Sequence, residues 1–397
     1  MLDSEVYIHP DIQIYLQPVP ADVIDSYQAS QLGACIDIHT EKNFPDLTNT
    51  KLAIVGVCEG RKSVGNENSA HAPNKIREYL FKLFKNSNHL KIADLGNVEQ
   101  GFEVKDTYYA LSKIVTELVK KNIIPIIIGG GQDLTYANYT AYQNLEQTVN
   151  LVSIDPLFDM GMIDQPIDSN SYLGSIILHQ PNYLFNYSNI GYQTYLTDSA
   201  SIDLMNKLYF DTYRLGMFKH NMEEIEPIVR NADMMSFDVS SIRMSDAPGC
   251  GNAGPNGFYG EEACQIMRYA GLSDKLSSIG IYEYNPEFDV RGQTAQLIAQ
   301  MIWCFMDGYV SRKDDFPVAP KKDFAKYHVL VDDNEKYEII FYKSPKSDRW
   351  WMEVPYPTTK NARFERHYLV PCSYRDYQFA LNNGMPDRWW QTFQKLS

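Results

Sequence analysis

Short apolar runs of strand length recur through the middle of the chain. They lie at Leu52–Val57, Ile124–Ile128, 151–154, 234–237 and 279–282. Each run is apolar almost throughout, without the alternation that a strand with one solvent-facing side would have. The pattern therefore predicts strands that are buried on both faces.

Longer stretches with apolar residues at helical spacing separate these runs. They lie at 74–84, 108–119, 261–270 and 293–306. Short buried strands that alternate with amphipathic helices are typical of a parallel sheet covered by helices on both sides. The pattern predicts an α/β fold with a doubly wound parallel sheet.

The two ends of the chain differ from this regular middle part. Residues 1–50 show no clean period, and we expect an N-terminal segment that packs on an α/β domain spanning 51–310. Residues 311–397 form a C-terminal extension, which starts with a linker-like stretch and continues with a β-hairpin turning at 332–334. The tryptophan pairs at 350–351 and 389–390 make it aromatic-rich. Such a tail either packs on its own core or forms an interface with another subunit or a protein partner.

The composition is that of a globular protein, with 44% hydrophobic and 22% charged residues. A formal net charge of −14 argues against nucleic acid and anionic membrane surfaces as partners, because both attract lysine and arginine. The N-terminus has no signal-like apolar stretch, so we expect a soluble, cytoplasmic protein without membrane insertion. Six cysteines without metal-type spacing indicate reduced thiols.

Acidic and glycine-rich motifs follow the predicted strands. In doubly wound sheets, ligands bind at the carboxyl ends of the strands, so these motifs can converge on one cleft. For any single motif the alternative is an ordinary turn, because Asp and Gly favour turns. The residues concerned are Gln132 and Asp133 after the glycines at 129–131, then Asp155, Asp159, Asp238 and Glu283.

Three of these motifs resemble the metal-binding loops of the ureohydrolase superfamily, which includes arginase, agmatinase and formimidoylglutamase. They are IIIGGGQD at 126–133, SIDPLFD at 153–159 and SFDVSSIRMSDAPG at 236–249. The GGGQD form and the NIGYQTYL segment at 189–196 are most similar to formimidoylglutamase. The resemblance implies a three-layer arginase-like fold, a site for two manganese ions and a homo-oligomer.

The metal-ligand positions that the resemblance assigns are only partly kept. Carboxylates remain at three of the six positions, and other side chains replace ligands at three. The resemblance matches Asp155, Asp159 and Asp238 to ligands, whereas Gln132 and Leu157 stand where it expects histidine and Ser240 where it expects aspartate. Two-metal hydrolysis needs enough donors to hold both ions around a bridging hydroxide. We therefore expect no metal cofactor, with weakly bound manganese or magnesium as the alternative.

Two further positions bear on how such a cleft would work. Arg243 stands where the family has an aspartate, and we expect it either to replace the metal charge among the aspartates or to point to solvent. Glu283 matches the family glutamate that handles the amidine end of the substrate. Glu283 and Asp133 are therefore the candidate catalytic residues. The candidate ligand cleft comprises Gln132, Asp155, Leu157, Asp159, Asp238, Ser240, Arg243 and Glu283.

These observations predict a formimidoylglutamase-like protein that has lost dimanganese hydrolysis and acts as a binding or protein-interaction component. Its expected ligand is a small cation or amidine. The alternative is a hydrolase of C–N bonds in amidines with a rearranged or single-ion site. Other chemistries lack support, because the sequence has no histidine pair at metal spacing, no phosphate-binding loop and no GxSxG motif.

Overall fold

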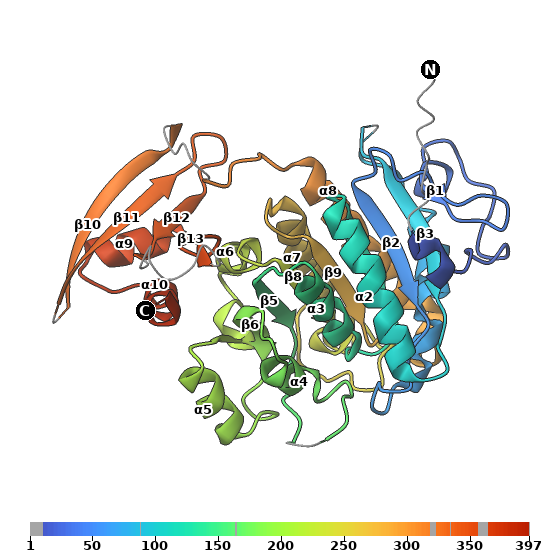
Figure 1. Ribbon diagram of the computed structural model, residues 1–397, viewed down its shortest axis with the longest axis horizontal. Helices are drawn as coiled ribbons and strands as arrows, with labels where there is room; N and C mark the ends of the chain where they lie inside the picture. Colours follow the sequence, from blue (N-terminus) through green and yellow to red (C-terminus); the bar gives the residue numbers. More distant parts are fainter. Residues whose placement is uncertain are drawn as a thin grey trace.

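Nine parallel strands form the central sheet of the computed structural model (Figure 1), which describes residues 11–87, 89–162, 165–317, 323–333, 335–355 and 364–396. Their order across the sheet is β1-β3-β2-β4-β9-β8-β5-β6-β7. The strands are β1 (Asp37–Ile38), β2 (Leu52–Val57), β3 (Ile92–Val98), β4 (Ile124–Ile128), β5 (Val149–Ile154), β6 (Leu184–Tyr192), β7 (Asp211–Arg214), β8 (Met234–Asp238) and β9 (Ser278–Tyr282).

Helices cover both faces of this sheet (Figure 1). One face carries α1 (Ala72–Leu80), α6 (Ile225–Arg230), α7 (Gly260–Leu272) and α8 (Gln293–Val310), and the other α2 (Val104–Lys120), α3 (Leu134–Asn144) and α4 (Tyr172–Leu178). A further helix, α5 (Ser199–Lys207), precedes β7. Successive side chains of β2 enter opposite cores, Ile54 the first and Val55 the second, as strand geometry requires. The predicted three-layer, doubly wound α/β fold is confirmed.

The order of the strands creates a crevice at the middle of the sheet. Strands β2 and β3 lie on the outer side of β4, and the chain then crosses to β5 and continues in the opposite direction through β6 and β7. Strands β9 and β8 lie between β4 and β5. Ligand sites of doubly wound sheets lie at such a reversal, outside the carboxyl ends of the strands.

The five predicted strands are present, and the helices differ mainly at their ends. The helix predicted over 74–84 is α1, which ends at Leu80. Strands β3, β6 and β7 were not predicted as strands, because polar residues interrupt their apolar pattern. In β3 the buried Asp94 accepts hydrogen bonds from Arg77 Nε and Nη2, both at 2.8 Å. Such pairing lets a charged residue lie within a doubly covered strand.

The N-terminal residues described by the structure, 11–50, pack along the β1 edge of the sheet. The short strand β1 pairs with β3, and the backbone of Gln17 exchanges hydrogen bonds with Asn97 of β3. Leu16 and Val19 are buried. This segment therefore covers the edge strands of the sheet, which would otherwise present unpaired backbone groups.

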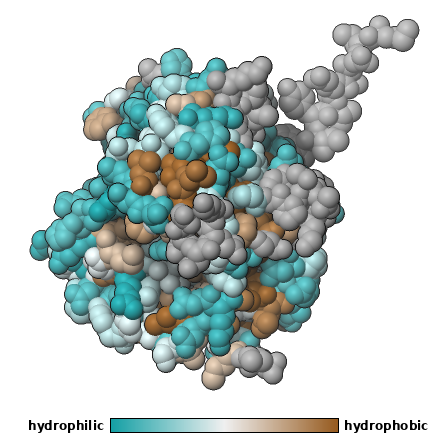
Figure 2. All heavy atoms as spheres, turned by 90° about the vertical axis from the view of Figure 1, so that its left-hand side faces the viewer, coloured by the Kyte–Doolittle hydropathy of each residue, from teal (hydrophilic) through white to brown (hydrophobic). Residues whose placement is uncertain are grey.

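The C-terminal extension forms a second, antiparallel sheet of β10 (Ala325–Asp333), β11 (Glu335–Lys343), β12 (Trp350–Glu353) and β13 (Leu369–Cys372), with helices α9 (Tyr374–Leu381) and α10 (Asp387–Leu396). The predicted β-hairpin is confirmed as β10 and β11, with Asn334 outside the described residues. Trp350, Trp389 and Phe341 lie in the core between this sheet and its helices. Figure 2 shows that hydrophobic patches on this end of the molecule are broken up by hydrophilic surface.

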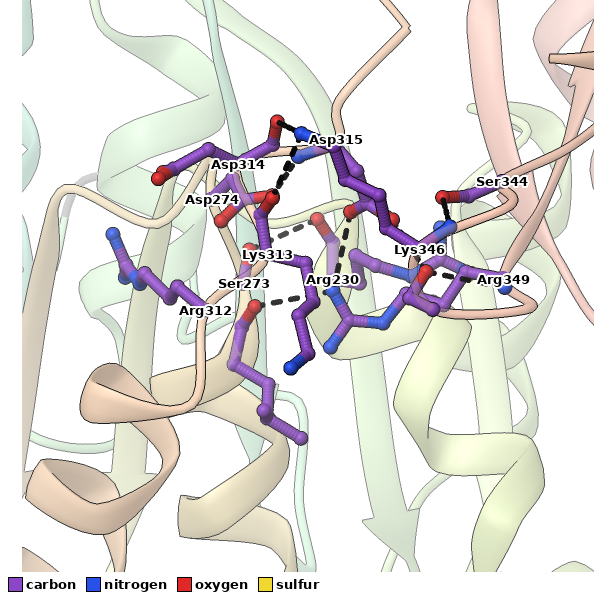
Figure 3. Close-up of polar contacts among 12 residues, drawn as sticks. Arg230, Ser273, Asp274, Arg312, Lys313, Asp314, Asp315, Ser344, Lys346 and Arg349 are labelled. Atoms are coloured by element: carbon purple, nitrogen blue, oxygen red, sulfur yellow. Dashed lines mark hydrogen bonds and ion pairs between the residues drawn. The ribbon is translucent and has the colours of Figure 1, made fainter. Parts of the chain in front are cut away.

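Polar contacts join the extension to the α/β domain (Figure 3). The backbone N–H of Asp315 donates to Asp274 Oδ2 at 3.1 Å, and Arg349 Nη1 donates to the carbonyl of Leu272 at 3.3 Å. On the neighbouring side, Arg366 Nη2 lies 2.7 Å from Asp233 Oδ1. The extension thus packs directly against the α/β domain. Among the helices that the structure describes, none has the length and apolarity needed to cross a membrane.

Candidate functional site

The glycine turn after β4 brings Gln132 to the middle of the crevice. Gly129 and Gly130 have φ of +87° and +77°, which residues with a Cβ rarely adopt. A Cβ on Gly130 would lie 2.4 Å from Leu134 Cδ1 and 2.6 Å from the carbonyl oxygen of Glu59. The turn therefore requires glycine, and it directs the buried Gln132 side chain toward β5.

Asp155, directly after β5, is fully buried and accepts three hydrogen bonds from protein groups. Its Oδ2 accepts Gln132 Nε2 at 2.8 Å and Ser153 Oγ at 3.4 Å, and its Oδ1 accepts the Leu157 N–H at 2.7 Å. Asp159 lies near enough to feel the charge of this carboxylate. Burial raises the pKa of both acids, and the charge of Asp155 raises that of Asp159 further.

Asp238, at the end of β8, is hydrogen-bonded to Ser240, which stands where the family resemblance expects an aspartate ligand. Its Oδ1 accepts the Ser240 N–H at 2.7 Å, and its Oδ2 accepts Ser240 Oγ at 2.5 Å. Burial raises its pKa well above the ordinary value, and the charges of Asp155 and Glu283 add to that rise. Ser240 therefore acts as a hydrogen-bond donor toward a carboxyl group that faces the cleft.

Glu283 completes the group of acids from the end of β9. Its Oε2 accepts Ser63 Oγ at 2.6 Å and Asn66 Nδ2 at 2.8 Å, and its Oε1 accepts the Gln132 N–H at 2.8 Å. The residue has φ of +67°, a left-handed conformation that is uncommon for glutamate and frequent at functional sites. Burial raises its pKa, whereas these hydrogen bonds oppose the rise.

Three of these acids line a cleft of about 360 Å³, here called the acidic cleft, and Asp155 is not among its lining residues. Asp159, Asp238 and Glu283 face it, and no lysine or arginine is among its lining residues in the described part of the chain. Gln132, Leu157 and Ser240 line it as well. The four strand ends predicted to converge therefore do so, and the result is a small hollow with acidic and hydrogen-bonding walls.

Arg243 lies outside the acidic cleft, so the hypothesis that it replaces the metal charge among the aspartates is wrong. Its Nε donates to Asp246 Oδ1 at 2.9 Å, and its guanidinium carbon lies 3.7 Å from the centre of the Tyr259 ring. The local reason is the tight loop after β8, in which the N–H of Asp246 bonds to the Arg243 carbonyl. Arg243 is therefore paired with an acid of its own loop and does not line the acidic cleft.

Asp133 also departs from its predicted role as a catalytic candidate. Its Oδ2 accepts a hydrogen bond from the hydroxyl of Tyr108, which lies on α2, and it does not line the acidic cleft. Burial raises its pKa to about 7, with the charges of Glu283 and Glu59 contributing. The side chain therefore faces the helix layer on one side of the sheet.

The sequence did not predict the polar side chains that bond to the acids or to Gln132. Ser63 and Asn66 come from the loop after β2, and Tyr172, whose hydroxyl accepts Gln132 Nε2 at 3.2 Å, comes from α4. They are separated from their partners by between 40 and 220 residues. No local motif marks them, although Asn66 stands in the polar segment GNENS at 65–69.

Comparisons with known proteins agree with this geometry. The family model of the arginase family matches residues 50–307. The chain belongs to the arginase family. It is 27% identical over 279 residues to the formimidoylglutamase of Staphylococcus haemolyticus, covering 68% of this chain and 89% of that protein. It is 26% identical over 252 residues to the formimidoylglutamase of Geobacillus sp., covering 60% of this chain and 77% of that protein.

Two solved structures share the arginase-family fold of this chain. The Trypanosoma cruzi formiminoglutamase, crystallised with manganese, superposes with a TM-score of 0.63 at 18% identity and covers 71% of this chain and 99% of that one. The Bacillus subtilis formimidoylglutamase also gives 0.63 at 18% identity, covering 72% and 95%. The family model ends at residue 307, so strands β10 to β13 lie beyond it.

The side chains of the acidic cleft do not fit a pair of divalent metal ions. Leu157 offers only an aliphatic side chain, and the amide of Gln132 already donates to Asp155. Ser240 Oγ donates to Asp238, which directs its hydrogen at the carboxylate. Within the described residues, no three His, Cys, Asp or Glu side chains are arranged so that they could hold a metal ion. Two ions held roughly 3.5–4 Å apart need more ligands than remain here.

Proposed function

We propose that this arginase-family chain binds a small cationic or amidine ligand in the acidic cleft and does not carry out dimanganese hydrolysis. The observation that carries the proposal is the donor set around the carboxyl groups. Gln132 donates to Asp155 and Ser240 donates to Asp238, so two positions that hold metal ligands in the family carry hydrogen-bond donors. Such a cleft is stable without an ion, since its acids already have partners.

The ligand class follows from charge and shape. Asp159, Asp238 and Glu283 face a hollow of about 360 Å³ that has room for a planar cation of a few heavy atoms. Carboxylates bind guanidinium and amidinium groups through paired, charge-assisted hydrogen bonds. Glu283 is held by three donors, which orients its carboxylate before a ligand arrives. We therefore assign Glu283 the main contact with the cation.

A hydrolase of C–N bonds in amidines is the second candidate. Its support is that the similar curated proteins are formimidoylglutamases, and that the carboxyl groups of Asp159 and Asp238 face one cleft, with Asp155 bonded to Gln132 of its wall. Carboxylate oxygens are ligands that Mg²⁺ and Mn²⁺ accept, so this candidate requires the side chains to rearrange around a single ion. The extension as a protein-binding surface and the homo-oligomer stay predictions beside either function.

Metal content and turnover separate the two candidates. We expect purified protein, dialysed against manganese and then against buffer, to retain far less than one manganese per chain. We also expect no formamide or urea from formimidoylglutamate, arginine or agmatine. Retention of about two manganese per chain together with product release would refute the proposed loss of hydrolysis.

Ligand binding is tested with agmatine by isothermal titration calorimetry. We expect Glu283→Gln to weaken agmatine binding about tenfold or more, since a charged hydrogen bond is lost. The matched control is Glu287→Gln, which removes an exposed carboxylate outside the cleft and leaves binding unchanged. Urea, which has a similar planar shape without the charge, should bind far more weakly. Equal binding of agmatine by parent and Glu283→Gln would exclude this assignment.

A further inference from the structure

A second hollow, of about 530 Å³, lies beside the acidic cleft and has the opposite charge. Arg214, Lys219 and Arg243 line it, and Glu262 is the one acidic residue among its described lining residues. The hollow is here called the basic pocket. Three cations against one acid stand out in a chain with a net charge of −14. Its volume lies in the range of small-molecule sites, about 300–1,000 Å³.

The cationic side chains of the basic pocket have N–H groups that are not paired with carboxylates of the residues that the structure describes. Arg214 Nε donates to the hydroxyl of Tyr192 at 3.0 Å, and in the described part of the chain its guanidinium has no carboxylate partner. No hydrogen bond or ion pair holds the Lys219 ammonium among the described residues. Arg243 uses its Nε for Asp246, and Glu262 Oε2 accepts the N–H of Tyr259 at 2.8 Å. Positive charge is therefore available to a ligand.

Aromatic side chains form the walls between these cations. Tyr192, Phe218 and Phe258 are buried and line the interior of the pocket. Tyr195 and Tyr259 line it from exposed positions, with 69% and 39% of their surface accessible. Rings in this arrangement bind the flat, apolar part of a ligand by burial and stacking. The pocket thus combines a cationic end with an aromatic surface.

One turn separates the basic pocket from the acidic cleft. Gln193 and Tyr195 line the basic pocket, whereas Leu196 lines the acidic cleft. The turn is held by the Leu196 N–H, which donates to the Gln193 carbonyl at 2.9 Å. The Gln193 N–H in turn donates to the carbonyl of Pro156, a residue of the acidic cleft, at 3.0 Å. The two hollows are therefore separate sites with a common wall.

We propose that the basic pocket is a second ligand site, which binds a small organic anion with a carboxylate or phosphate attached to an aromatic ring. Arg214 and Lys219 pair with the anionic group, and the guanidinium of Arg243 borders it. Tyr195 and Tyr259 cover the ring. A cation such as agmatine is excluded from this pocket by charge, so the ligands of the two hollows differ in kind.

The probe for this site is phenyl phosphate, titrated into the full-length protein by isothermal titration calorimetry. We expect Arg214→Gln and Lys219→Gln each to weaken binding about tenfold, because each removes one charge-assisted contact. The control is Lys207→Gln, which removes an exposed lysine on α5 that does not line the pocket. Its affinity should equal that of the parent. Thermal unfolding of each variant verifies that the fold is intact.

Two control probes test separately the need for a negative charge and the need for an aromatic ring. Benzyl alcohol should bind far more weakly than phenyl phosphate, since it lacks the charge. Inorganic phosphate should also bind more weakly, since it lacks the ring. The proposal is overturned if phenyl phosphate fails to bind the parent, or binds Arg214→Gln and Lys219→Gln as tightly as the parent.

Discussion

Arg230, at the end of α6, holds the extension against the α/β domain from a buried position (Figure 3). Its Nη2 donates to the carbonyl oxygens of Trp350 at 3.2 Å and Cys372 at 3.3 Å. Its Nε donates to Glu226 Oε1 at 2.9 Å. The guanidinium carbon lies 4.3 Å from the centre of the Trp351 ring. One side chain of the core therefore binds strands β12 and β13 together.

Replacement of Arg230 by alanine should destabilise the docked extension by about 3 kcal/mol. Removal of one partner of a buried, hydrogen-bonded charge pair costs about 3–5 kcal/mol. The lower end applies here because Glu226 retains a cation, Arg349 Nε, at 3.2 Å from the same carboxylate oxygen. The loss consists of the two carbonyl bonds and the contact with Trp351.

Urea unfolding measures this effect, because the chain places its tryptophans unevenly. Of the five tryptophans, only Trp303 lies before residue 311, so fluorescence reports mainly on the extension and far-ultraviolet circular dichroism on the whole chain. We expect the fluorescence midpoint of Arg230→Ala to fall by about 1–3 M urea, because the loss is about 3 kcal/mol and the slopes are about 1–3 kcal/mol per molar. The fluorescence transition should then precede the dichroism transition.

The control for Arg230→Ala is Arg268→Ala on the exposed side of α7. Arg268 Nε lies 2.9 Å from Asp307 Oδ2 with 46% of its side chain accessible, and exposed pairs of this kind contribute about 0–1 kcal/mol. The reasoning is refuted if Arg230→Ala shifts the fluorescence midpoint no further than Arg268→Ala does. It is also refuted if the two transitions of Arg230→Ala coincide at a strongly lowered midpoint, because core and extension would then unfold as one unit.

Two further predictions concern stability. Burial lowers the pKa of His367 well below its usual value, so the unfolded chain binds the proton more tightly and stability is lost as pH falls below about 6.5. The urea midpoint of His367→Gln should therefore depend less on pH between about 6.5 and 5 than that of the parent; equal slopes would contradict this. Gly130→Ala should cost about 2 kcal/mol or more, because its φ of +77° and the close Leu134 leave no room for a Cβ; an unchanged midpoint would exclude that strain.

The sheet was predictable because its central strands are apolar throughout. Runs such as Ile124–Ile128 have no other place in a folded chain than between two layers. The outer strands were not predictable in this way, since β6 contains Asn186, Ser188 and Asn189, all buried. Asn186 Nδ2 and Ser188 Oγ bond to Asp211 Oδ2 at 2.6 and 3.0 Å. Asp211 of β7 satisfies these buried polar groups, but it lies more than 20 residues further along the chain, so the local sequence of β6 does not indicate it.

The acids of the site were predictable from their place after strands, whereas their partners were not. Asp155, Asp238 and Glu283 follow β5, β8 and β9, and parallel strands bring such ends together. The direction of a side chain depends on its immediate competitors. Arg243 has Asp246 three residues away, and that pair formed in place of a contact with the cleft. Charge at the right position was therefore insufficient evidence for charge in the cleft.

The last prediction tests whether donors have replaced metal ligands. Ser240 Oγ donates to Asp238 Oδ2, so Ser240→Asp alone sets a second carboxylate against a buried acid. We expect this change to destabilise the fold by about 2–4 kcal/mol, since the hydrogen bond becomes a repulsion. Ser240→Ala removes the same hydroxyl without adding charge, and it should cost only about 1–2 kcal/mol.

Manganese should reverse that loss only where the other ligands are present. In the triple variant Gln132→His, Leu157→His and Ser240→Asp, imidazole and carboxylate donors return together, and a bound ion supplies the charge that the acids need. Ion at 100 times its Kd would stabilise the fold by about 2.7 kcal/mol. Thermal unfolding with and without MnCl₂ gives the comparison, with Ser240→Asp as the control that should respond little. If manganese raises the Tm of the triple variant no more than that of the parent, these loops do not correspond to the family's metal-binding loops.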